Sequence, residues 1–252
     1  WTNVWDNNVY KEDGVTNIFS DVGSDINGLY ITDTDPNHLI CYLHGYYGTG
    51  DNSGVFESTD GGGKWIVHGT SYFNFQAHSD VAFPINTTTW EVSHGTTYPN
   101  SELWQTTDSG ATWGVIKNDF WIGGWNGAQN LRVGSVIYGE GKPMAKSTDE
   151  GATWARIDAA GPMGTSAVTE TGYIYVTPGD QDQGAAAFNL KRASVDNDAV
   201  WEDVAGPDAA DMYKGCCIGS LSSYRMVATY DGAHAVLVSN NMMSGIWRYV
   251  EP

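Results

Sequence analysis

The eight residues Ser58-Thr59-Asp60-Gly61-Gly62-Gly63-Lys64-Trp65 combine a turn signal with a Trp, and they recur along the chain. A second copy, TTDSGATW, occupies 106–113, and a third, STDEGATW, occupies 147–154. Two degenerate copies read SVDNDAVW at 194–201 and SNNMMSGIW at 239–247, the last with one extra residue. The Asp or Asn of each copy stands at 60, 108, 149, 196 or 241, so the steps are 48, 41, 47 and 45 residues. A period in the forties with strand-like flanks is typical of the blades of a β-propeller.

The chemistry of this repeat is that of a tight turn. Its Asp can accept hydrogen bonds from backbone N–H groups just ahead, and its Gly supplies a backbone position with positive φ. The Trp then opens the next strand and packs against a neighbouring sheet. We therefore interpret the Asp residues of the repeat as turn-forming residues and not as catalytic acids.

Short strands account for the rest of each repeat, and we find no amphipathic helix of three turns. In the first repeat we expect a turn at 35–37 and four strands, at Gly28–Thr32, His38–Leu43, Val55–Ser58 and Trp65–His68. The last repeat divides in the same way, with its first strand at 217–220. Each repeat thus has the four strands of a propeller blade.

The sequence therefore predicts an all-β chain, 1–252, that forms a single β-propeller domain. Five blades of four antiparallel strands are expected, with six blades as the alternative. The expected blades cover roughly 24–70, 71–118, 119–160, 161–206 and 207–252. Residues 1–23 remain as an N-terminal closing or capping segment, which can be a spare outer strand, a ring-closing strand or the remnant of another blade.

The pattern Ser/Thr-x-Asp-x-Gly-x-Thr-Trp resembles the Asp-box, also called the bacterial neuraminidase repeat. That repeat occurs in sialidases, in xyloglucan-degrading hydrolases with tandem propellers, in some polysaccharide lyases and in sortilin-type receptors. The resemblance implies the propeller fold, but it does not choose between enzymes and binding proteins. A sialidase fits poorly, because its chemistry needs an arginine triad with one Arg ahead of the repeats, whereas the first of the five Arg here is Arg132.

Charge and composition exclude several classes of function. The formal net charge is −18, which disfavours nucleic acid and anionic membranes as partners, because both are bound through clustered Lys and Arg. Hydrophobic residues make up 41% of the chain, which is enough for a packed core and excludes a disordered chain. We expect a monomer whose ligand is an oligo- or polysaccharide.

The mouth of a propeller is the end of the sheets opposite the repeat turns, where the loops after the second strands emerge. The second strand ends in His44-Gly45 in the first repeat and in His94-Gly95 in the second, so the two His are equivalent. Aromatic rings stack on the C–H face of sugars, while Asp, Asn, His and Arg hydrogen-bond to hydroxyl groups. The residues expected to act in catalysis are Asp25, Asp80, His44, His94 and His78. Those expected to bind substrate are Tyr46, Tyr47, Tyr98, Trp121, Trp125 and Arg132.

Several chemistries and a structural interpretation remain open for these residues. A hydrolase of neutral glycans would use two carboxylates as acid and base or nucleophile, and a lyase would use a His or Tyr base beside a cation. A lectin would need only the aromatic mouth, and a protein-interaction propeller is a further alternative. The same Asp side chains can simply cap strands, and the same Trp can pack between blades. No cofactor is expected, and the His spacings match no metal-ligand signature.

The cysteines and the N-terminus bear on the compartment. Few Lys, high acidity and one N-glycosylation sequon, Asn86-Thr87-Thr88, fit a secreted protein. The chain starts without Met or a signal-peptide core, as a processed chain or an expressed fragment would. Cys41 lies in the first repeat and Cys216–Cys217 in the last. A bridge from Cys41 to either Cys would join the ends of the ring, and a vicinal disulfide between Cys216 and Cys217 is the alternative.

Overall fold

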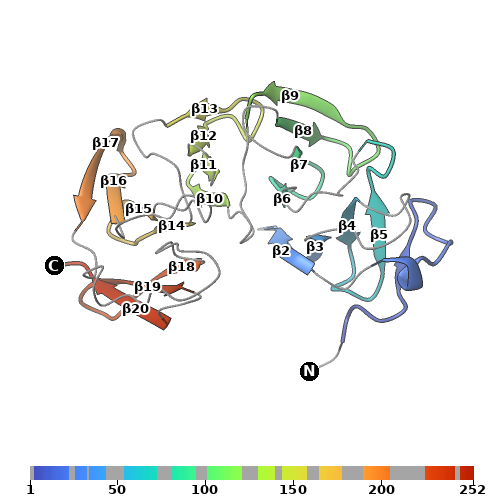
Figure 1. Ribbon diagram of the computed structural model, residues 1–252, viewed down its shortest axis with the longest axis horizontal. Helices are drawn as coiled ribbons and strands as arrows, with labels where there is room; N and C mark the ends of the chain where they lie inside the picture. The colour runs from blue at the N-terminus through green and yellow to red at the C-terminus, as the bar shows by residue number, and fades with distance from the viewer. Residues whose placement is uncertain are drawn as a thin grey trace, which may run out of the picture. The chain divides into compact units, whose positions relative to one another are not determined.

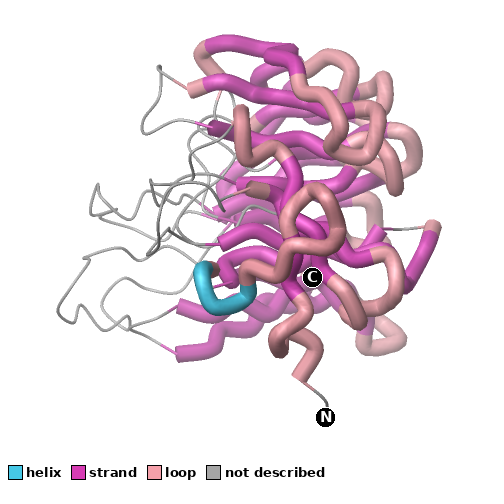
Figure 2. Tube along the Cα trace, turned by 90° about the vertical axis from the view of Figure 1, so that its right-hand side faces the viewer, coloured by secondary structure: helices cyan, strands magenta, loops and turns pink. Residues whose placement is uncertain are grey.

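The structure is a computed structural model of the 252-residue chain. It describes residues 3–22, 26–32, 34–43, 54–72, 81–94, 101–120, 130–139, 144–157, 165–177, 190–204, 225–241 and 245–252. Regular structure in these ranges is β-strand, apart from the short 3₁₀ helix η1 at Phe19–Asp21 (Figure 2). The chain divides into two compact units, Trp1–Gly127 and Ala128–Pro252.

The described residues of the first unit form two sheets (Figure 1). The first sheet has the order β1-β5-β4-β3-β2 and consists of β1 Val9–Tyr10, β2 Ile26–Thr32, β3 Asp35–Leu43, β4 Val55–Ser58 and β5 Trp65–His68. The second has the sequential order β6 Val81–Pro84, β7 Trp90–His94, β8 Glu102–Thr106 and β9 Gly114–Asn118. Strand β6 contacts both β2 and β3, so the inner strands of the two sheets lie together.

The described residues of the second unit form three antiparallel sheets. One consists of β10 Asn130–Val133, β11 Val136–Gly139, β12 Ala145–Ser147 and β13 Ala155–Arg156. The next consists of β14 Thr165–Val168, β15 Tyr173–Thr177, β16 Leu190–Ser194 and β17 Asn197–Val204. The last consists of β18 Arg225–Tyr230, β19 Ala235–Asn241 and β20 Gly245–Val250. Strand β14 contacts both β10 and β18, so the first strands of these sheets lie side by side. The strand expected at 217–220 lies outside the described residues.

The strands predicted for the first repeat are confirmed, with changes at some ends. Val55–Ser58 and Trp65–His68 form strands as predicted. The turn predicted at 35–37 is wrong, because Asp35 already pairs with Thr32 in the sheet. The Thr32 hydroxyl also donates to the Asp35 carbonyl at 3.1 Å, which makes the connection tighter than expected. Among the described residues, three sheets have four antiparallel strands in sequential order, which agrees with the prediction of an all-β chain.

The three intact repeats form the same hydrogen-bonded turn. In the first, the Ser58 hydroxyl donates to Asp60 Oδ1 at 2.9 Å and accepts the Gly62 N–H at 2.8 Å. Asp60 Oδ1 also accepts the Lys64 N–H at 2.9 Å. Matching bonds of 2.7 to 3.0 Å hold the turns at Asp108 and Asp149. The predicted turn-forming role of the repeat Asp is therefore confirmed in these three copies.

The N-terminal segment adds a strand to the outer edge of the first sheet. Val9–Tyr10 pairs in parallel with β5, with Val9 opposite Trp65. The Asn8 side chain donates to the carbonyl groups of Gly62 and Gly63 at 2.9 and 3.1 Å, so the segment is also hydrogen-bonded to the first repeat turn. Of the three alternatives for residues 1–23, this pairing is that of a spare outer strand.

One largely enclosed carboxylate, that of Asp198, links two neighbouring sheets of the second unit. Asp198 on β17 accepts hydrogen bonds from Lys146 Nζ on β12 at 2.6 Å and from the Tyr138 hydroxyl on β11 at 3.2 Å. Asp198 is 12% exposed and Lys146 is 31% exposed. The bonds of Asp198 therefore tie its own sheet to the sheet that precedes it.

Cys41 is a free cysteine in the core of the first sheet. It packs in one buried cluster with Trp5, Phe56 and Trp65. Burial raises the pKa of its thiol above the ordinary value. The predicted bridge from Cys41 is therefore not found, because its side chain is enclosed by this apolar cluster. Cys216 and Cys217, including their alternative vicinal pairing, lie outside the described residues.

Within the described ranges, no helical segment has the length and apolar character that a membrane crossing requires.

Candidate functional site

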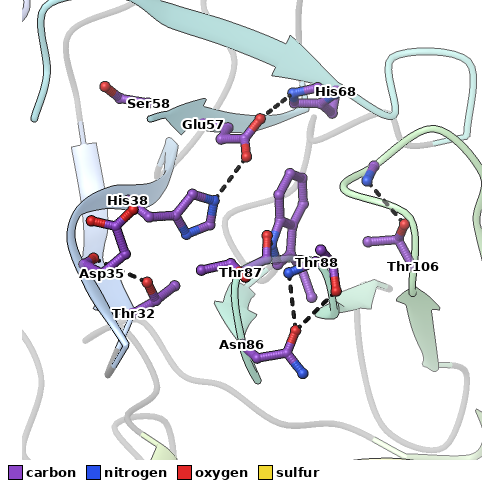
Figure 3. A network of polar contacts seen from close by, with 12 residues as sticks. Thr32, Asp35, His38, Glu57, Ser58, His68, Asn86, Thr87, Thr88 and Thr106 are labelled. Carbon is purple, nitrogen blue, oxygen red and sulfur yellow. Dashed lines mark hydrogen bonds and ion pairs between the residues drawn. The ribbon is translucent and has the colours of Figure 1, made fainter. Parts of the chain in front are cut away.

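Two histidines and a glutamate form a hydrogen-bonded network on one face of the first sheet (Figure 3). His38 is on β3, Glu57 on β4 and His68 on β5. Ile40 pairs with Glu57, and Glu57 pairs with Ile66, so residues two positions from each Ile share the face of Glu57. His38 Nε2 lies 2.8 Å from Glu57 Oε1, and His68 Nε2 lies 3.0 Å from Glu57 Oε2.

Trp90, from the second sheet, covers this network. Its ring centroid lies 5.9 Å from that of His38 and 5.3 Å from that of His68. Gly110 of the second repeat turn closes the remaining side. A Cβ at Gly110, which has a φ of +84°, would lie 2.8 Å from both the His68 Cβ and a Trp90 ring carbon. The position therefore needs glycine on steric and conformational grounds.

The network holds the Glu57 carboxylate in its ionised form, because the rings of His38 and His68 hydrogen-bond to it. Burial would raise the pKa of Glu57, but hydrogen bonds from His68 and His38 outweigh it and hold that pKa below the ordinary value. His38 is 3% exposed, Glu57 11% and His68 15%. His38 Nδ1 is buried and has no hydrogen-bond partner. We conclude that the network stabilises the contact between the two sheets, because its groups are too enclosed to reach a substrate.

A second group of residues lies at the mouth end of the second sheet and is more exposed. His94 at the end of β7 pairs with Glu102 at the start of β8, so their side chains share one face. Trp104 follows two residues later, on the same face, and its Nε1 donates to Glu102 Oε2 at 3.0 Å. The ring of Tyr72, which is 41% exposed, meets the Trp104 ring edge-on with centroids 6.1 Å apart. We call Tyr72, His94, Glu102 and Trp104 the aromatic patch.

The aromatic patch has the chemistry of a sugar-contacting surface. Aromatic rings offer apolar faces to the C–H groups of a pyranose, and the carboxylate and imidazole offer hydrogen-bonding groups. A carboxylate and an imidazole are also the groups that serve in general acid–base catalysis. Among the residues that the structure describes, no group of three His, Cys, Asp or Glu is placed to hold a metal ion.

Two of the residues expected at the site fall within the described ranges. His94 ends its strand as predicted and belongs to the aromatic patch. Arg132 lies close to the β10–β11 turn and donates to Glu150 of the third repeat turn at 2.8 Å. Within its own sheet Arg132 is therefore at the repeat-turn end, and its placement at the mouth is corrected. The other predicted residues lie outside the described ranges: Asp25, His44, Tyr46, Tyr47, His78, Asp80, Tyr98, Trp121 and Trp125.

Sequence reasoning missed most of the residues that the structure brings together. Tyr72, Glu102 and Trp104 reach His94 through strand register and through the connection that follows β5. One usable signal was the polar residue Glu57, which follows the apolar pair Val55-Phe56 and stands three residues before the repeat Asp. Gln105 and Lys146 occupy the same position in the next two repeats, so polar character there is recurrent.

The sequence matches no known protein-family profile and no curated protein. Among solved structures, the chain is similar to a GH74 xyloglucanase from Xanthomonas campestris, with a TM-score of 0.56 and 17% identity. That alignment covers 91% of this chain and 36% of the xyloglucanase, so the chain spans little more than a third of the enzyme. The chain is also similar to YCF48 in a structure with a bound D1 peptide, with a TM-score of 0.52 and 14% identity, covering 91% of this chain and 69% of YCF48.

These likenesses support a β-propeller fold for this chain. At 14 and 17% identity they carry no information beyond the fold. The sequential antiparallel sheets of both units agree with that fold.

Proposed function

We propose that the chain is a secreted, monomeric β-propeller of five blades that degrades an oligo- or polysaccharide of plant or microbial origin, as a glycoside hydrolase or a polysaccharide lyase. The observation that carries the proposal is the aromatic patch, in which Tyr72 and Trp104 adjoin Glu102 and His94. The net charge of −18 favours a neutral glycan over an anionic one.

Each member of the aromatic patch has an expected role. Trp104 and Tyr72 stack on a sugar ring, and the hydrogen bond from the Trp104 indole orients the Glu102 carboxylate. In a hydrolase, Glu102 is one of the two carboxylates that the reaction needs. In a lyase, His94 is the base that removes the proton beside the uronate carboxyl group. Asp80 and His78, predicted at the same mouth, are the candidates for the second catalytic group.

The proposal is tested by incubation with a panel of neutral and uronate-containing polysaccharides, followed by assays for new reducing ends and for unsaturated uronates. Trp104→Ala and Glu102→Gln are each expected to lower the rate at least 10-fold. Trp201→Ala, which removes a half-buried Trp of the second unit, is the matched control and is expected to retain the rate. Binding of a glycan without product would indicate a lectin, and neither binding nor product would contradict the proposal.

Peptide binding is a second candidate function. The YCF48 structure to which the chain is similar holds a bound D1 peptide. The pair of Tyr72, which is exposed, and Trp104, which is half-buried, beside a carboxylate would also receive an apolar or basic peptide. Two results together would favour this candidate. The protein would bind peptides of an array that the Trp104→Ala variant does not bind, and it would neither bind nor degrade any polysaccharide of the panel.

A further inference from the structure

We propose that Asn86 is an acceptor site for N-linked glycosylation, an inference that rests on the secretion included in the proposed function. Asn86 begins the sequon Asn86-Thr87-Thr88 in the turn between β6 and β7. Strand β7 runs from this turn to His94, so Asn86 lies at the opposite end of the sheet from the aromatic patch. Thr88 is exposed, while Asn86 and Thr87 are half-buried.

The carboxamide of Asn86 has its two polar atoms in different surroundings. Its Oδ1 accepts the N–H groups of Thr88 and Thr89, both at 2.9 Å, and the Thr88 hydroxyl at 3.2 Å. Because Oδ1 faces into the turn, Nδ2 on the other side of Cγ points out of it (Figure 3). The nitrogen that would carry a glycan is therefore the atom directed away from the turn.

The turn itself is anchored on both sides. The Ser109 N–H donates to the Thr88 carbonyl at 3.0 Å, which connects the turn to the second repeat turn. The indole N–H of Trp90 donates to the Thr87 carbonyl at 3.2 Å. These bonds hold the sequon on the surface with Thr88 exposed.

The transfer changes only the nitrogen of Asn86. A bond forms between Nδ2 and the anomeric carbon of a lipid-diphosphate-linked oligosaccharide, which is the co-substrate. The bond from that carbon to the diphosphate oxygen breaks, the lipid diphosphate leaves with its electron pair, and Nδ2 loses one proton. Since Oδ1 remains an amide oxygen, all three hydrogen bonds of the turn persist in the product.

The test is secretion of the whole chain from eukaryotic cells behind a cleavable signal, followed by intact-mass and peptide analysis. We expect a mass increase that peptide N-glycosidase removes, with conversion of Asn86 to Asp. Thr88→Ala should abolish the increase, and Thr88→Ser should retain it at lower occupancy. Asn86→Asp removes the acceptor nitrogen but keeps a carboxylate oxygen for the turn, so this variant should be secreted and folded without glycan.

Two outcomes separate this inference from the proposed function. Folded, secreted protein with unmodified Asn86 would overturn the inference, whatever its action on polysaccharides. Because Asn86 and the aromatic patch lie at opposite ends of the sheet, the Asn86→Asp variant should retain polysaccharide activity within about twofold. A glycosylated protein that is silent on every glycan would contradict the proposed function and leave Asn86 as an acceptor.

Discussion

The repeat turns are alike in the three intact copies, whereas the polar side chain three residues before each repeat Asp has different partners in every copy. The turns at Asp60, Asp108 and Asp149 share one set of hydrogen bonds. Three residues earlier in each copy, the side chains are a carboxylate, an amide and an ammonium group. Glu57 accepts from two His, Gln105 donates to Glu91 at 2.9 Å, and Lys146 donates to Asp198 at 2.6 Å.

The difference follows from where the partners come from. All atoms of the shared hydrogen bonds lie within seven residues of sequence, so the same local pattern of residues forms the same turn in each copy. The side chain three residues before the repeat Asp instead pairs with residues of other strands, which belong to the same sheet for Glu57 and Gln105 and to the next sheet for Lys146. The turns therefore repeat, whereas each of these three polar side chains is paired in its own way.

Replacement of Trp90 should have the largest effect, because it removes the ring that covers the His38–Glu57–His68 network. Trp90 is fully buried and also contacts Trp113, with centroids 6.4 Å apart. We expect Trp90→Ala to lower the free energy of unfolding by about 3–5 kcal/mol, measured by urea denaturation. Trp201→Ala, at a half-buried Trp of the second unit, should cost clearly less. Equal losses would show that the sheet contact in the first unit is not special.

The second largest effect on stability is expected for Glu57→Gln, and this effect should depend on pH. At neutral pH we expect Glu57→Gln to cost about 1–3 kcal/mol, because the amide cannot accept from both imidazoles. The folded-state pKa of Glu57 lies below the ordinary value of 4.5, so the unfolded chain binds more protons between the two values. The stability from Glu57 is thus fully present above pH 4.5 and is lost as pH falls through the folded pKa.

Urea titrations of both proteins between pH 7 and pH 3 measure this effect. The difference between wild type and Glu57→Gln should shrink on acidification below pH 4.5. Glu202→Gln is the matched control, because Glu202 is 58% exposed in its ion pair with Arg192 and should contribute at most about 1 kcal/mol. A difference that stays constant down to pH 3 would contradict the role of the ionised carboxylate.

The same distinction explains what could be predicted from the sequence. The turn at Asp60 and the strands Val55–Ser58 and Trp65–His68 were predictable, because a local signal specifies each of them. His94 was predictable as a strand end at the mouth. Trp104 was not, because it meets Tyr72 only through the connection after β5 and the packing of the two sheets.

Buried polar networks were beyond sequence reasoning for a related reason. His38, Glu57 and His68 are separated by 19 and 11 residues, and only the strand register brings them together. Arg132 shows the converse error. Asp25 and Asp80 directly precede the first strands of their repeats, but Arg132 is the third of the four residues of β10 and therefore lies near the β10–β11 turn, at the repeat-turn end.

Removal of the ammonium group at Lys146 tests the contact between two sheets of the second unit. We expect it to lower the free energy of unfolding by less than the replacement of Trp90 does. Lys146→Met keeps most of the apolar stem but leaves Asp198 with the Tyr138 hydroxyl as donor. We expect a loss of about 1–2 kcal/mol, since Lys146 is partly exposed. Lys64→Met is the control, because exposed Lys64 donates to a backbone carbonyl of the N-terminal segment and should change stability by at most about 0.5 kcal/mol. If Lys146→Met and Lys64→Met lowered the free energy of unfolding equally, the contact between sheets would contribute no more to stability than a surface hydrogen bond.

The smallest effects should come from the turns, where an intact copy can be compared with a degenerate one. Asp108 accepts from the Thr112 hydroxyl and N–H and from the Thr106 hydroxyl, and these bonds lower its pKa to about 2. In the degenerate copy, the pairing of Ser194 with Asn197 closes a two-residue turn, so the backbone already supplies what Asp108 supplies elsewhere. Asp108→Ala should therefore lower the urea midpoint more than Asp196→Ala. The gap should close as pH falls from 3.8 towards 2, because protonation of Asp108 in the Asp196→Ala protein then removes the carboxylate that the Asp108→Ala protein already lacks. If Asp196→Ala lowered the midpoint as much as Asp108→Ala, the shared hydrogen bonds would not be what distinguishes the intact turns.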